Sequence, residues 1–222
     1  MYDEELTRIS PRARILNVVG VGGIGKTRAE ALMAQAKDEY RTAEAVIGLA
    51  NIRTNQAELL VVTDPEAAVQ EAGVALEVQR ELGAQHEIGK VYTAMGTAQI
   101  RLGQLDRAEL SLANANAALD RAGYRSGRAR ADTFRAFLHL RRGDGQATRE
   151  LLRHVAREFE ECEVHPSLIL AIHRASERIG PADPEIAAAA ERARPSLRVL
   201  GTAEDLERRT EEVLSMFIEV NS

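Results

Sequence analysis

Between residues 82 and 144 the sequence repeats with a period of 40 residues, and few folds are compatible with such a period. A glycine follows an apolar residue at 82–83 and again at 122–123, and basic residues recur in the same way. Lys90 is matched by Arg130, and Arg101 by Arg141. A fixed period of this size is typical of a solenoid, in which each unit is a pair of helices that stacks on the next unit.

Three positions in the second helix of each unit follow the same period. Within a unit they are spaced four and then three residues apart, which places them on one face of a helix. Because several of them are small, we expect two helices to approach closely there. The three sets are Ala68, Ala108 and Thr148; Ala72, Leu112 and Leu152; and Ala75, Ala115 and Val155.

The composition agrees with a helical fold. Hydrophobic residues make up 45% of the 222 residues, but aromatic residues only 4%. Alanine, leucine, glutamate and arginine dominate, as they do in all-helical proteins. We therefore predict an all-α solenoid, with a short strand and a phosphate-loop-like segment near the N-terminus; the resemblance described below implies a right-handed superhelix.

Charge, cysteine content and hydropathy indicate the cellular compartment and the kinds of partner to expect. The net charge of −5 predicts no general affinity for nucleic acid. The single cysteine, Cys162, excludes an intrachain disulfide and is typical of the cytoplasm. No close Cys/His pair completes a metal site with Cys162 and His165. An apolar run of about 18 residues is missing and the N-terminus is polar, so we expect neither a membrane span nor a signal peptide.

One unit, Gly89 to Leu119, resembles a tetratricopeptide repeat. The resemblance extends over about residues 42–178 and implies a scaffold that binds a protein or peptide. It is weaker over 127–159, where Asp132 and Arg135 replace apolar residues and the turn at 143–145 reads as one residue short. The residues that carry it are Tyr92, Met95 and Gly96 in the first helix, Gly103 and Leu105 in the turn, and Ala108, Leu112 and Ala115 in the second helix.

In tetratricopeptide arrays the first helices line a concave surface, so the resemblance implies a groove across two successive units. Four cations around it would attract an acidic or phosphorylated segment through charge-assisted hydrogen bonds. A merely solvated face of scattered charges is the other interpretation, and the sequence leaves it open. The expected groove residues are Lys90, Thr93, Thr97 and Arg101 in one unit and Arg130, Thr133, Phe137 and Arg141 in the next.

Residues 20–27, GVGGIGKT, match a complete phosphate-loop pattern. An apolar run at 15–19 precedes them as a predicted strand, and a helical segment follows. The loop resembles that of STAND-type signalling ATPases, which implies binding of ATP with Mg²⁺. Backbone amides at the glycines would hold the phosphates, Lys26 would reach the β- and γ-phosphates, and Thr27 would hold Mg²⁺. The glycines are Gly20, Gly22, Gly23 and Gly25.

An ATPase also needs an acidic residue at the end of a second strand. The candidate is Asp64, which follows the apolar run 59–63. Asp64 also fits the N-cap of a helix that has Pro65 at its first position, and we favour this interpretation. Most of the sheet of an ATPase core has no counterpart in the sequence.

The sequence divides into a phosphate-loop segment (1–27), helical repeats (28–180) and two C-terminal helices (181–222). We expect the last helix to cap the stack or else to form a homodimer interface. The favoured function is a non-enzymatic scaffold for a protein or an acidic peptide in regulation or signalling, without catalytic residues or cofactor. The alternative is a regulatory switch in which ATP at residues 20–27 controls the repeats.

Overall fold

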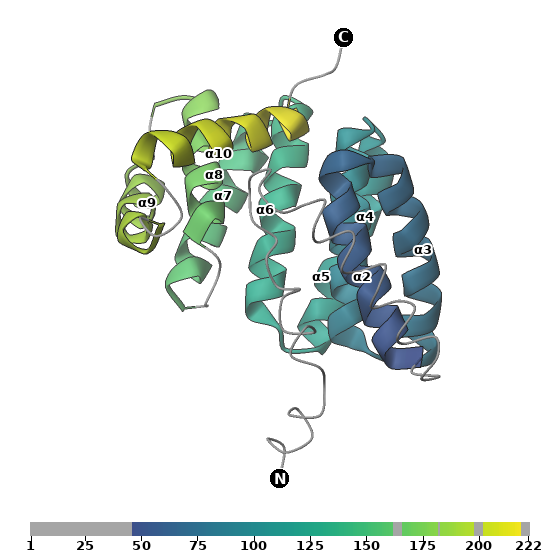
Figure 1. Cartoon of the computed structure of the whole chain (residues 1–222). Helices are drawn as coiled ribbons and strands as arrows, with labels where there is room; N and C mark the ends of the chain where they lie inside the picture. The colour runs from purple at the N-terminus through teal and green to yellow at the C-terminus, as the bar shows by residue number, and fades with distance from the viewer. Residues whose placement is uncertain (1–45, 162–165, 182, 198–201, 219–222) are drawn as a thin grey trace.

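The computed structural model describes residues 46–161, 166–181, 183–197 and 202–218. Within these ranges all regular structure is α-helical, and none of the helices is long and apolar enough to cross a membrane. The predicted strand and phosphate loop lie outside the described residues. The helices follow one another as an array (Figure 1): α2 (Val46–Thr63), α3 (Pro65–Glu81), α4 (Gln85–Arg101), α5 (Leu105–Arg121), α6 (Arg125–Arg141), α7 (Gly145–Glu161), α8 (Pro166–Arg178), α9 (Pro184–Leu197) and α10 (Ala203–Ile218).

The helices α3 to α7 each contain 17 residues and begin 20 residues apart. The first four end at a glycine with positive φ, between 64° and 77°, a conformation that other residues adopt at a cost. At Gly103 the backbone N–H donates to Ile100, and the next N–H donates to Gln99 at 2.9 Å, which is a Schellman motif. The turn at 142–144 has the same length as the others, so the expected shortening there is wrong. The four glycines are Gly83, Gly103, Gly123 and Gly143.

The repeat positions predicted from the sequence form the core of the array. All nine side chains lie in α3, α5 and α7, and each is 0% exposed, which confirms the assigned register. Glycines in α4 bring its backbone close to α5. A Cβ atom at Gly96 would lie 2.7 Å from Cγ of Leu112, and one at Gly89 would lie 2.4 Å from Cγ of Leu119.

Each helix packs on its neighbour, and successive first helices of the pairs also contact one another: α2 with α4, α4 with α6, and α6 with α8. We call the surface formed by these four helices the first-helix face. α9 packs on α7 and α8, so the array continues past the proline-containing segment 180–184. α10 departs from this order: its larger contacts are with α8 and α6, and it also reaches α4 (Figure 1).

Asp64 belongs to a helix boundary. Residues 59–63 form the last turns of α2, so the interpretation of this run as a strand is wrong. The Asp64 carboxylate accepts a hydrogen bond from the backbone N–H of Ala67 at 3.0 Å, and Pro65 is the first residue of α3. This confirms the favoured N-cap interpretation, and Asp64 does not stand at the end of a strand where an Mg²⁺ ligand was considered.

Candidate functional site

The four uncharged residues of the expected groove are buried. Thr93, Thr97, Thr133 and Phe137 are at most 3% exposed, so none of them faces an open groove, but Phe137 does lie on the first-helix face, where Phe217 of α10 covers it. Each threonine hydroxyl donates to a backbone carbonyl one turn earlier in its own helix, as Thr97 does to Thr93 at 2.6 Å. These bonds satisfy the hydroxyls where water does not reach them.

Two of the expected groove cations bind the ends of neighbouring helices. Arg101, at the end of α4, donates from Nη1 to the carbonyl oxygens of Val61 at 2.5 Å and Val62 at 2.6 Å, in the last turn of α2. Arg141, at the end of α6, donates in the same way to the carbonyl of Ile100 in α4. The C-terminus of a helix carries unpaired carbonyls and partial negative charge, so a cation is stabilising there. Burial lowers the pKa of the Arg101 guanidinium from its usual value.

The other two expected cations are also paired within the chain. Arg130 of α6 contacts Glu58 of α2 at 2.8 Å, although α4 lies between these helices in the sequence. Lys90 contacts Glu87, one turn earlier in α4, at 3.1 Å. Because side chains of α2 and α6 meet, the first-helix face curves inward there. The structure therefore brings the predicted cations to this face, but with partners from the array itself.

α10 docks on a different part of the first-helix face, the part formed by α6 and α8. Phe217 is buried against two aromatic side chains of α6, with ring centroids 5.6 Å from Phe134 and 6.2 Å from Phe137. Leu214 and Thr210, three and seven residues earlier, are buried as well. This spacing defines one face of a helix, so α10 docks as an amphipathic helix.

Ion pairs border the apolar contact between α10 and the array. Arg174 of α8 contacts Glu207 at 3.2 Å, and Arg178, one turn later, contacts Glu211. A hydrogen bond to Glu177 in its own helix raises the pKa of Arg174, and the charges of Glu177 and Glu207 add to this effect. The two arginines of α8 and the two glutamates of α10 therefore have the same spacing of four residues, and each arginine faces a glutamate.

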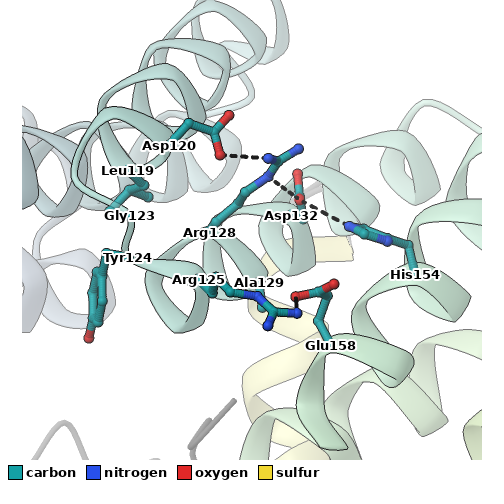
Figure 2. A pocket seen from close by; sticks show the side chains of 10 residues that line it. All are labelled: Leu119, Asp120, Gly123, Tyr124, Arg125, Arg128, Ala129, Asp132, His154 and Glu158. Atoms are coloured by element: carbon teal, nitrogen blue, oxygen red, sulfur yellow. Dashed lines mark hydrogen bonds and ion pairs between the residues drawn. The ribbon is translucent and has the colours of Figure 1, made fainter. Parts of the chain in front are cut away.

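A charged cavity of about 260 Å³ lies where the α5–α6 turn meets α6 and α7 (Figure 2). At its centre the buried Asp132 accepts hydrogen bonds from Asn116 at 2.6 Å and from Arg135 at 3.2 Å. His154 lies 4.0 Å from the same carboxylate. The lining residues include no serine, threonine or cysteine that such a His/Asp pair would activate. They are Leu119, Asp120, Gly123, Tyr124, Arg125, Arg128, Ala129, Asp132, His154 and Glu158.

The cavity lies between successive helix pairs, and most of its charged lining residues are paired with one another. Arg128 pairs with Asp120 at 2.5 Å and Arg125 pairs with Glu158 at 2.9 Å, so opposite charges in the lining neutralise each other. Arg135 also reaches Glu109 of α5 at 3.6 Å. Asp132 and Arg135, which replace apolar residues here, connect α6 to α5 through the hydrogen bond from Asn116 and the ion pair with Glu109, and His154 of α7 lies beside Asp132.

The described part of the chain offers no cluster of metal ligands. It holds no group of three or more His, Cys, Asp or Glu side chains placed to bind a metal ion. Cys162 and His165 lie outside the described residues, as do all the predicted phosphate-loop residues from Gly20 to Thr27.

The sequence interpretation missed the residues of the first-helix face that contact α10. The last helix was expected to cap the stack or to form a homodimer interface, and Phe134, Arg174 and Arg178 were not singled out. A signal was present, because Arg174 and Arg178 have the same spacing as Glu207 and Glu211. Comparison with protein-family models, with curated proteins and with solved structures gives no match for this chain.

Proposed function

We propose that the protein is a non-enzymatic helical-repeat module that binds a helical segment of a partner protein on its first-helix face. The observation that carries this proposal is the docking of α10 on α6 and α8. There the array accommodates an amphipathic helix with an aromatic anchor, Phe217, and an acidic border. Docking of an amphipathic helix in an apolar groove is a recurring mode of protein recognition.

Charge and shape both favour an acidic helix. Arg174 and Arg178 border the surface with positive charge, while Phe134 and Phe137 supply the apolar floor. Aromatic anchors give the affinity in such interfaces, and bordering charges chiefly give specificity and faster association. The proposal keeps the acidic partner expected from the sequence and moves its site from α4 and α6, which hold the expected groove residues, to α6 and α8.

The test is a selection of displayed peptides on the full-length chain carrying Phe217→Asp, which places a charge in the apolar contact and frees the face. We expect enrichment of peptides with an apolar stripe at helical spacing and flanking carboxylates. The matched control adds Arg174→Glu and Arg178→Glu, which should remove these acidic peptides from the selection. Enrichment of the same peptides by both chains, or no enrichment by either, would contradict the proposal.

A nucleotide-dependent regulatory switch is the second candidate. The complete GVGGIGKT match favours it. In that case Lys26 and Thr27 bind the phosphates and Mg²⁺, and nucleotide binding changes the accessibility of the repeats. Nucleotide titration of wild type and Lys26→Ala separates this candidate from a scaffold without a ligand-dependent state.

A further inference from the structure

The geometry points to α10 as an internal competitor, which occupies the first-helix face until an acidic partner helix displaces it. This inference rests on the proposed function, because it names both the partner's chemistry and the regulation of the same surface. It concerns a helix at the end of the array that folds back over earlier helices, α6 and α8, while α9 already continues the stacking order.

The contacts of α10 define what the partner must present. Going along α10, two carboxylates lie four residues apart, Leu214 follows three residues later, and Phe217 follows three residues after that. Glu207 and Glu211 meet the arginines of α8, while Leu214 and Phe217 are buried. A partner helix with the pattern Glu-x₃-Glu-x₂-Leu-x₂-Phe would reproduce all four contacts. The partner is therefore an acidic amphipathic helix with an aromatic anchor at its C-terminal end.

The ion pairs of α10 suit a displaceable helix. Glu207 and Glu211 are 41% and 47% exposed in the docked state, so water screens their pairs with Arg174 and Arg178. Exposed ion pairs of this kind steer and orient a helix more than they fix it. Because α10 and a partner helix need the same side chains, each excludes the other. The apparent affinity for the partner falls in proportion to the fraction of molecules with an open face.

The test measures binding of a labelled peptide spanning residues 202–218, by fluorescence anisotropy, to full-length chains. Phe217→Asp in the chain should raise the affinity for the peptide by about tenfold or more, since the internal competitor no longer docks. Met216→Asp is the matched control, because Met216 lies next to Phe217 in α10 but is 37% exposed. This control should bind the peptide no more tightly than wild type does.

A second variant avoids the apolar contact. Glu207→Arg with Glu211→Arg in the chain reverses only exposed charges, and it should also raise the affinity for the native peptide. Arg174→Glu with Arg178→Glu, added to the Phe217→Asp chain, should abolish binding of the native peptide. A peptide with both glutamates changed to arginine should restore it. Such a charge exchange is expected only if the peptide occupies the position of α10.

The outcomes separate the two proposals. Equal affinity of wild type and both opened variants would overturn the internal competitor and leave the binding surface intact. No binding to any chain would overturn the proposed function as well. Loss of helicity throughout the array in both opened variants would show that α10 is an integral part of the fold and overturn the inference. A wild-type dimer that becomes a monomer on Phe217→Asp would show that α10 docks on a second copy, which also overturns it.

Discussion

The arginines at the ends of α4 and α6 join each of these helices to the first helix of the preceding pair. Arg101 binds the final carbonyls of α2, and Arg141, 40 residues later, binds a carbonyl near the end of α4. The 40-residue recurrence of Arg101 as Arg141 is therefore explained by the end of the preceding first helix, without any external ligand. These hydrogen bonds are partly buried, and a carbonyl that loses a charged donor costs free energy to the extent that water cannot replace that donor.

Replacement of Arg101 by glutamine should lower the free energy of unfolding by about 1.5–3 kcal/mol, the usual range for hydrogen bonds to a charged group. Two carbonyls, those of Val61 and Val62, lose their charged donor. The control is Arg107→Gln, an exposed arginine of α5, which should change stability by less than about 0.5 kcal/mol. Urea titrations followed by circular dichroism measure both, and equal midpoints for the two variants would contradict the capping role.

The carboxyl group of Asp183 makes the free energy of unfolding depend on pH. Burial alone would raise the pKa of this carboxyl, but hydrogen bonds from Arg153 and from the backbone N–H groups of Ile186 and Glu185 hold its pKa below the ordinary value of 3.8. A group whose pKa is lowered by folding stabilises the folded state above its unfolded-state pKa. That contribution disappears as the pH falls through the folded-state pKa.

We therefore expect Asp183→Asn to be less stable than wild type at neutral pH, with a difference that shrinks below a pH of about 4. Asparagine is also a good N-cap, so the comparison isolates the charge that meets Arg153 at 2.6 Å. Thermal unfolding of both chains across this pH range measures the effect. A stability difference that stays constant down to a pH of about 2 would argue against a charge-dependent contribution.

At the scale of the helices, two glycines in similar sequence settings should respond in opposite directions. Gly96→Ala should destabilise by about 1–3 kcal/mol, because the new Cβ would lie 2.7 Å from Cγ of Leu112. Gly73→Ala, in α3, should stabilise by about 0.5–1 kcal/mol, since a Cβ there meets nothing within 4 Å. Chemical denaturation gives both values. Effects of the same sign would mean that α4 and α5 are not packed as closely as described.

Much of the array could be predicted from the sequence, because the repeat positions bury small or apolar side chains at helical spacing. Ala72, Leu112 and Leu152 are examples, and all three are fully buried. The 20-residue spacing of the four positive-φ glycines was also in the sequence, but only the 40-residue period was recognised. One helix with its turn takes 20 residues, and two of them make one 40-residue unit.

The ligand surface was harder to predict, because a helical pattern does not say what covers each face. Thr97 and Arg101 lie one turn apart in α4, yet the first is buried and the second is held by α2. Whether a basic residue meets a ligand or a helix end depends on the curvature of the array. The position of α10 likewise depends on contacts with α6 and α8, far away in sequence.

Across the whole molecule, the first-helix face differs between its two halves. On the α2–α4–α6 side, Arg130 and Glu58 bridge helices two pairs apart with a contact of 2.8 Å. On the α6–α8 side, α10 supplies the carboxylates instead, at Glu207 and Glu211. Both halves thus pair an arginine with a glutamate from a distant helix. Among the described helices, α10 alone follows the stacked array and can leave without separating two stacked helices.

The final prediction concerns nucleotide binding by the full-length chain. We expect no ATPase activity above background, and weak or absent ATP binding that Lys26→Ala leaves unchanged. A phosphate loop acts together with a parallel sheet and an acidic residue that orients Mg²⁺ and water. Asp64, the candidate for that acid, caps α3 and follows a helix. Isothermal titration calorimetry with ATP and Mg²⁺ measures binding in both chains. A micromolar Kd that disappears in Lys26→Ala would favour the regulatory switch, and the peptide titration repeated with ATP would then show whether nucleotide binding controls the first-helix face.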